Sequence, residues 1–193
     1  VQTCALPIYL NIVYDEIRRL SRLVIDLLDI SAMEEGKFKL NMVEFDINIL
    51  IKQCIAKFDG KIRNKGVNVE VTFGREHEFV YADRDRLIQV LTNIIDNAMK
   101  YSNDNGNIKI TTNDKGSKVY VSVFNNGPLL KDEELARIWD RFYKSDKART
   151  NKDSTGLGLP IVRLILAQHG EDIWVNNEQD GVRFTFTISK KIG

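Results

Sequence analysis

A change of hydrophobic period near Gly36 divides the sequence into a purely helical part and a mixed part. Before it, apolar residues recur at steps of three, four, three, four and three, at Leu10, Val13, Ile17, Leu20, Val24 and Leu27. This spacing is the seam of a heptad repeat, and Gly36 is a typical helix stop. The pattern predicts a long helix over residues 10–35. Such a helix either packs on its own domain or, as the regular seam favours, is half of a helical hairpin that pairs with another chain.

After Gly36, strand and helix patterns alternate. Strands are predicted at 38–45, 67–73, 79–81, around 108–110, 119–123, 173–175 and 182–188, and helices at 46–64, 83–101, 132–143 and 157–168. Asp46 and Asp83 are expected N-caps, Gly66 closes the first of these helices, and Asp114-Lys115-Gly116 is a hairpin turn. Antiparallel strands joined by hairpins, with helices on one face, predict an α+β two-layer sandwich. We therefore expect a hairpin part at residues 1–36 and a catalytic domain at 37–193.

Composition excludes several classes of protein. The formal net charge is +1, from 28 basic and 27 acidic residues, so no strong field favours nucleic acid or an anionic membrane surface. Apolar runs are far shorter than the roughly 20 residues that span a bilayer. The first ten residues lack the basic start and cleavage site of a signal peptide, and Pro7 there interrupts the helical pattern. Cys4 and Cys54 are too few for a disulfide framework or a metal site.

The predicted helix DRLIQVLTNIIDNAMKYS, Asp85 to Ser102, carries polar residues with a chemical use. Asn93 and Asn97 are four apart and share a face, and Lys100 lies three further on. The two amide oxygens could bind Mg²⁺ and the ammonium group a phosphate. Taken alone, the same residues are better explained as a solvated stripe on an amphipathic helix.

Two glycine-containing stretches follow. VFNNGPL, Val123 to Leu129, is a turn signal at a strand end, and STGLGLPIVRLILAQHG, Ser154 to Gly170, opens a helix. Gly156 and Gly158 lie where free backbone N–H groups and the helix dipole favour a phosphate. Each stretch alone is also compatible with an ordinary loop.

The order of these motifs is more specific than any one of them. The chain resembles the kinase core of bacterial sensor histidine kinases, within the gyrase, chaperone and mismatch-repair ATPase superfamily. DRLIQVLTNIIDNAMKYS resembles the N box, NNGPL the first glycine box, RIWDRFYKSD the F box, TGLGL the second glycine box and GVRFTFTI the last glycine-box strand. LLDISAMEEGKFKLN resembles the end of the second helix of the dimerisation and histidine-phosphotransfer hairpin. The resemblance covers essentially residues 10–188.

The resemblance implies a role for each matching residue and implies ATP and Mg²⁺ as ligands. Asn97 is expected to be the principal Mg²⁺ ligand, and Asn93 to support the metal or the phosphates. Lys100 is expected to meet a phosphate, and Tyr101 to pack near the adenine or the ribose. Asn125 stands where the family usually has an aspartate that accepts the adenine amino group, so weaker ATP binding is expected.

The loops complete the expected ATP site. Gly127 lets the backbone approach the base, and Phe142 and Tyr143 anchor a lid, with Arg141 and Lys144 as candidate phosphate contacts. The second glycine box closes over the phosphates through Thr155, Gly156, Leu157, Gly158 and Leu159. Leu129 and Asp153-Ser154 replace glycines that the family usually has, which makes the backbone less permissive there.

The phosphoacceptor is expected to be absent. Neither His77 nor His169 is followed by the acid-arginine-threonine-proline pattern of the acceptor helix. The expected activity is therefore that of a protein-histidine kinase core, which transfers the γ-phosphoryl group of ATP to a histidine on the paired hairpin for relay to the aspartate of a response-regulator receiver domain. This fragment alone is expected not to phosphorylate itself.

The resemblance also implies a setting for the chain. It predicts a homodimer through the hairpin helix in the full-length protein, and a location in the cytoplasmic portion of a membrane-anchored bacterial sensor. No nucleic acid and no membrane contact by this fragment are expected.

Two other functions remain open. A catalytically weakened module that binds nucleotide or a partner would explain Asn125 and the lid changes. A hydrolase of the gyrase or chaperone type is disfavoured by the heptad helix and by Asn93, which lies where those enzymes carry a general-base glutamate.

Overall fold

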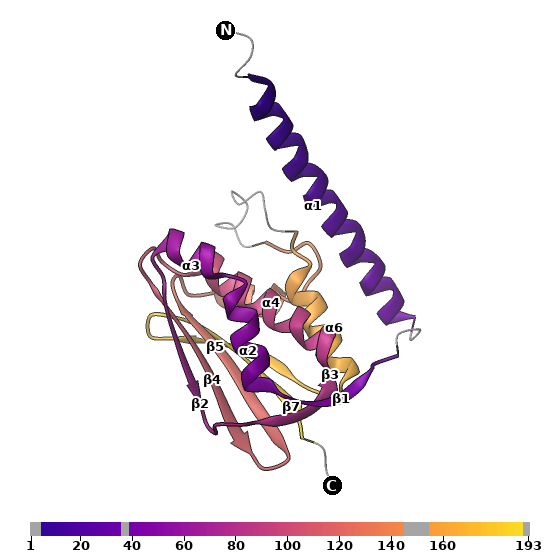
Figure 1. Cartoon of the computed structure of the whole chain (residues 1–193), viewed down its shortest axis with the longest axis vertical. Coiled ribbons are helices and arrows are strands. Elements are labelled where there is room, and N and C mark those ends of the chain that lie inside the picture. Colours follow the sequence, from indigo (N-terminus) through magenta and orange to yellow (C-terminus); the bar gives the residue numbers. More distant parts are fainter. Residues whose placement is uncertain (1–4, 36–38, 145–154, 191–193) are drawn as a thin grey trace.

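The computed structural model of the chain describes residues 5–35, 39–144 and 155–190, and within them a sheet covered on one face by helices (Figure 1). The strands are β1 (Met42–Asp46), β2 (Asn68–Phe73), β3 (Phe79–Asp83), β4 (Asn107–Lys115), β5 (Lys118–Asn126), β6 (Ile173–Glu178) and β7 (Gly181–Ser189). The helices are α1 (Ala5–Glu34), α2 (Ile47–Ala56), α3 (Asp59–Lys65), α4 (Arg84–Tyr101), α5 (Asp132–Arg137) and α6 (Gly158–Gln168). The predicted α+β two-layer architecture is confirmed.

The main sheet has five strands in the order β2-β4-β5-β7-β6, and β1 pairs with β3 in a separate two-stranded sheet. Four strands of the main sheet follow the antiparallel hairpin pattern, as at Thr112↔Val121 and Val121↔Phe186. β2 differs, because it pairs with β4 in parallel, from Asn68↔Asn107 onward. The expectation of an all-antiparallel sheet was therefore wrong at this edge. The chain between β2 and β4 crosses over through β3 and α4, and a crossover returns the next strand in the same direction.

Several helix boundaries follow the expected capping residues. The side chain of Asp46 accepts the N–H of Asn48 at the start of α2, and that of Asp83 accepts the N–H groups of Asp85 and Arg86 at the start of α4. Gly66 ends α3 with φ of +68°, a left-handed conformation that costs glycine little. These predictions were confirmed.

Other boundaries differ from the expectation. The helix predicted over 46–64 breaks into α2 and α3 at Phe58, whose side chain is buried in the core. The helix predicted over 132–143 ends at Arg137. Phe142, which the prediction placed in this helix, takes a φ of +61° and donates its N–H to the carbonyl of Gly156. α1 begins at Ala5, so Pro7 lies in the first turn, where no N–H is needed for the helix. The expected stop at Gly36 lies outside the described residues.

The core lies between the helices and the sheet. α4 buries Leu87, Val90, Leu91 and Ile94 completely, against α2, α6 and the face of β5. From the sheet, Ile110, Val121 and Phe186 are equally buried. Because α4 is packed along its apolar face, its opposite polar face is held in a fixed orientation at the surface.

α1 projects away from this core (Figure 1). Its last turns are held by the buried side chains of Ile30 and Met33 and by the carbonyl of Met33, which accepts an N–H from Gln168. The six apolar residues of the predicted heptad seam are each between 43% and 60% exposed. Within the described residues the seam therefore lies largely at the surface. No described helix combines the length and apolar character needed to cross a membrane.

Candidate nucleotide-binding site

α4 supplies the first wall of a cavity of about 340 Å³. Asn93, Asn97, Lys100 and Tyr101 all line it, since the apolar residues between them fix the helix face. The amide nitrogen of Asn93 makes a long hydrogen bond of 3.5 Å to the carbonyl of Gly158. The side chain of Asn97 makes no hydrogen bond within the described part of the chain, so its amide oxygen is available to a ligand.

The end of β5 supplies the second wall. Asn125 lines the cavity and is only 4% exposed, with its amide nitrogen 3.4 Å from the carbonyl of Asn126. Gly127 is not a lining residue, but its Cα packs against the carbonyl of Tyr101 so closely that a Cβ would overlap it. Gly127 thus sets how near β5 approaches the end of α4.

The third wall is the turn into α6. Gly156 has φ of +74° and lies against the backbone of Phe142, where a side chain would not fit. Within the described residues no side chain caps the start of α6, so the N–H groups of Gly158 and Leu159 are open to an acceptor such as a phosphate. Thr155, Gly156, Gly158 and Leu159 line the cavity, whereas Leu157 is completely buried in the core.

Ten of the twelve residues expected at the ATP site therefore line one cavity, and Gly127 and Leu157 support it from behind. Lys144 is among the ten, but Arg141 is not, since it forms an ion pair with Glu34 of α1. Sequence reasoning missed the apolar lining, which includes Leu130, Ile138, Val182 and Phe184, and it missed Asp26 of α1. These apolar residues look like ordinary core positions in the sequence, so only the fold identifies them.

The charges near the cavity are paired. Asp96 contacts the ammonium groups of Lys100 at 2.5 Å and Lys61 at 2.6 Å. Burial raises the pKa of Asp96, but the hydrogen bonds from Lys100 and Lys61 outweigh it and hold the pKa below its usual value. Burial, followed by the negative charges of Asp96 and Glu134, raises the pKa of Tyr101. At neutral pH Asp96 is therefore ionised and Tyr101 is a neutral phenol.

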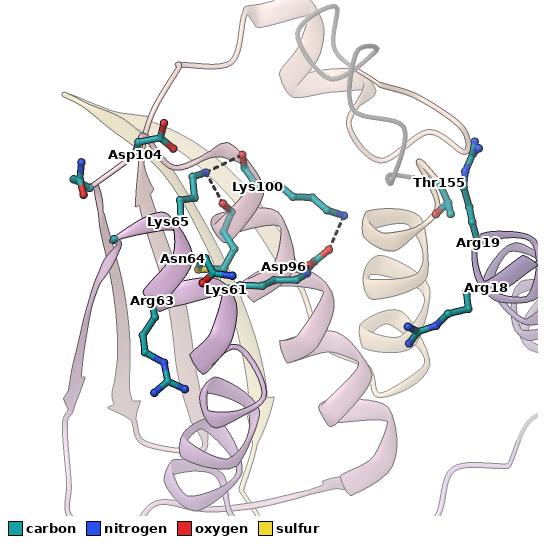
Figure 2. Close-up of a pocket in the computed structure, with 13 residues that line it drawn as sticks. Arg18, Arg19, Lys61, Arg63, Asn64, Lys65, Asp96, Lys100, Asp104 and Thr155 are labelled. Atoms are coloured by element: carbon teal, nitrogen blue, oxygen red, sulfur yellow. Dashed lines mark hydrogen bonds and ion pairs between the residues drawn. The ribbon is translucent and has the colours of Figure 1, made fainter. Parts of the chain in front are cut away.

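A second, open cavity of about 930 Å³ adjoins the first and shares Asp96, Lys100 and Thr155 with it (Figure 2). Six basic side chains line it, from α1, α3 and α4: Arg18, Arg19, Lys61, Arg63, Lys65 and Lys100. Most of them have internal partners. Lys65 donates to the carbonyls of Met99 and Ser102 at the end of α4, and Arg19 pairs with Glu16. The carbonyl partners of Lys65 leave its charge in place, and Lys61 and Lys100 share the single carboxylate of Asp96, so the lining keeps an excess of positive charge.

The donor set of the first cavity fits a hard divalent cation. Within the described ranges no group of three or more histidine, cysteine or acidic side chains could hold a metal ion. The two amide oxygens of Asn93 and Asn97, one helical turn apart, suit Mg²⁺, which keeps several waters and takes its remaining ligands from substrate phosphates.

The comparisons with known proteins agree with this geometry. The family described as histidine kinase-, DNA gyrase B- and HSP90-like ATPase matches residues 82–192, more than half of the chain. The chain belongs to this ATPase family. The sensor histidine kinase WalK of Bacillus subtilis (strain 168) is 34% identical over 189 residues, 96% of this chain and 31% of that protein. The sensor protein SrrB of Staphylococcus aureus (strain MRSA252) is 37% identical over 180 residues, 93% of this chain and 30% of that protein.

Solved structures give the same assignment. The nucleotide-free catalytic domain of the histidine kinase ThkA matches with a TM-score of 0.71 and 38% identity, over 78% of this chain and 97% of that one. ThkA in complex with the response regulator protein TrrA matches with a TM-score of 0.80 and 35% identity, over 99% of this chain and 53% of that one. This ATPase-family chain thus contains the ATP-binding catalytic core of a bacterial sensor histidine kinase, and it spans about a third of the length of its curated relatives.

Proposed function

We propose that the chain serves the transfer of the γ-phosphoryl group of ATP to a histidine on another segment, for relay to an aspartate of a response regulator. The observation that carries this proposal is the convergence of Asn93, Asn97 and Lys100 with Asn125 and the uncapped start of α6 on one cavity. A polar helix face alone would be a solvated stripe. Here the polar face of α4 lines the same cavity as the buried acceptor Asn125 and the start of α6, where a phosphate could bind. This combination supports a nucleotide site.

Different residues of the cavity would bind different parts of the nucleotide. The buried Asn125 would accept the adenine amino group, and the apolar residues of the cavity lining would hold the base. Lys100, Lys144 and the first N–H groups of α6 would bind phosphates. Asn97, with Asn93, would hold Mg²⁺, which when bound neutralises charge on the phosphates.

The two histidines of the chain have structural partners that support the absence of self-phosphorylation. His77 lies 2.8 Å from the carboxylate of Asp46, and His169 accepts the backbone N–H of Asp83. Neither lines the cavity. Incubation with radiolabelled ATP should therefore leave the chain unlabelled, and a labelled histidine in it would contradict this proposal.

The exposed seam of α1 supports a homodimer in the full-length protein, with residues 1–36 as part of the dimerisation hairpin and 37–193 as the catalytic domain. The complex of ThkA with TrrA supports a response-regulator receiver domain as a partner. Because the relatives are sensor proteins about three times as long, we place the chain in the cytoplasmic portion of a membrane-anchored sensor.

Titration with a fluorescent ATP analogue, with and without Mg²⁺, tests the function. The wild-type chain should bind in a metal-dependent manner, and Asn97→Ala should weaken binding at least about tenfold when Mg²⁺ is present. Asn113→Ala, an exposed asparagine of β4, is the matched control and should bind as the wild type does. No binding by the wild type would favour the non-catalytic interaction module instead.

A further inference from the structure

Lys61, which lies outside every ATPase motif of the sequence, contacts Asp96, a residue that lines both cavities. It comes from α3, 35 residues before Asp96, and its ammonium group lies 2.6 Å from one carboxylate oxygen of Asp96. The other oxygen of Asp96 contacts Lys100, four residues further along α4, at 2.5 Å. Figure 2 shows Asp96 between the lysine of α3 and the lysine of α4.

The charges of this triad decide what Lys100 offers to a phosphate. Asp96 alone would neutralise Lys100 and leave no net charge where the phosphates are expected. With Lys61 as a second partner, two ammonium groups share one carboxylate, so one positive charge remains at the cavity wall. Lys100 and Asp96 are each about one-fifth exposed, so their interaction is less screened by salt than that of a surface pair.

We infer that Lys61 is a positioning residue for nucleotide binding, which acts through Asp96 to hold the ammonium group of Lys100 in place toward the phosphates. This inference rests on the proposed function of the same cavity. Lys61 itself does not line the nucleotide cavity and is 61% exposed on its side chain, so it need not touch the nucleotide.

The chain offers a close control. Arg63 lies two residues from Lys61 on the same helix and lines the same open cavity, but no acidic partner is found for it among the described residues. Removing either side chain deletes one positive charge from the same surface. Only removal of Lys61 changes the partners of Asp96, so a difference between the two variants separates the triad from a general loss of charge.

The test compares the affinities of ATP–Mg²⁺, ADP–Mg²⁺ and adenosine for five variants, each shown by its melting curve to be folded. Lys61→Gln should weaken ATP and ADP binding about threefold to fivefold at low salt and leave adenosine unchanged. Lys61→Arg should retain wild-type affinity, and Arg63→Gln should stay within about twofold of it. In an Asp96→Asn background, Lys61→Gln should have no further effect, because the residue through which it acts is gone.

The inference would be overturned by unchanged ATP affinity in Lys61→Gln or by an equal loss in Arg63→Gln. An equal loss of ATP affinity for Lys61→Gln with and without Asp96 would overturn it as well. A weaker binding of adenosine that matches the loss for ATP would also overturn it, since it would indicate damage to the fold. If the wild type binds no ATP–Mg²⁺ at all, the proposed function itself fails. This failure is seen in the wild type alone and is therefore distinct from a failure of the inference about Lys61.

Discussion

Gly127 lies so close to Tyr101 that a Cβ on the glycine would overlap the backbone carbonyl oxygen of the tyrosine. The end of β5 and the end of α4 can therefore meet only through a residue without a side chain. This contact holds Asn125 and Tyr101 on facing walls of the nucleotide cavity.

Replacement of this glycine should damage both the fold and the site. Gly127→Ala should destabilise the chain by about 1–3 kcal/mol through overpacking, and should weaken ATP binding at least about tenfold. Gly60→Ala is the control, because a Cβ there has no heavy atom within 4 Å and alanine favours the helix. Urea unfolding and nucleotide titration measure the two effects, and an unaltered Gly127→Ala variant would refute the contact.

A substitution at Asn125 should raise the affinity for nucleotide. Asn125→Asp replaces a neutral acceptor by a charged one, which should tighten ADP binding about fivefold to tenfold, since charge assistance adds on the order of 1 kcal/mol. The same carboxylate is buried and unpaired without nucleotide, so the free chain should become less stable. Asn126→Asp adds an equal charge next to it, at a side chain that accepts the N–H of Asn107 outside the cavity. A gain in Asn126→Asp but not in Asn125→Asp would contradict the assignment.

Glu171 should make stability depend on pH. Burial raises its pKa, but hydrogen bonds from Lys118, Ser189 and Thr187 outweigh it and hold the pKa below its ordinary value of 4.5. Because the folded-state pKa is the lower one, the stabilisation is present above pH 4.5 and is lost as the pH falls through the folded-state pKa.

Glu171→Gln tests this dependence. It should cost about 1–3 kcal/mol at pH 7, since its buried partners lose an acceptor, and should flatten the loss of stability below pH 4.5. Glu178→Gln is the comparison, because that ion pair with Arg183 is exposed and should cost less than about 1 kcal/mol. Chemical unfolding at several pH values measures these effects. An equal loss of unfolding free energy in the two variants would contradict a stabilising role for the buried network around Glu171.

His169 joins α6 to the start of α4. Its Nε2 accepts the N–H of Asp83 at 3.0 Å, and its Nδ1 lies 2.8 Å from the carbonyl of Ile165, so the ring is the tautomer with hydrogen on Nδ1. Nitrogen NMR should detect this tautomer, and His169→Ala should cost about 1–3 kcal/mol, because the N–H of Asp83 loses its acceptor. His77→Ala, at a more exposed ring, should cost less. A ring with hydrogen on Nε2 would exclude the arrangement.

Much of the site was predictable because its signals are local. The cap at Asp83, the spacing of Asn93 and Asn97, and the glycines before α6 each depend on neighbours within one or two turns. The non-helical conformation of Phe142 was not predictable, because its N–H donates to the carbonyl of Gly156, 14 residues further along the chain. The parallel pairing of β2 was also missed, since alternation of apolar residues defines the buried face of a strand and not its partner. Lys61 gave no signal for the same reason, as only the packing of α3 beside α4 brings it to Asp96.

The attachment of α1 has a mechanical consequence. Its packed apolar residues begin at Leu23, and the described apolar side chains from Tyr9 to Leu20 are all more than half exposed, along about 20 Å of helix at 1.5 Å per residue. A tilt of about 15° at the attached end would move the far end by roughly 5 Å, one helical turn. Asp26, on the attached part, lines the nucleotide cavity. Because Asp26 and the exposed seam belong to one continuous helix, a rigid-body tilt of α1 would also displace Asp26 at the cavity.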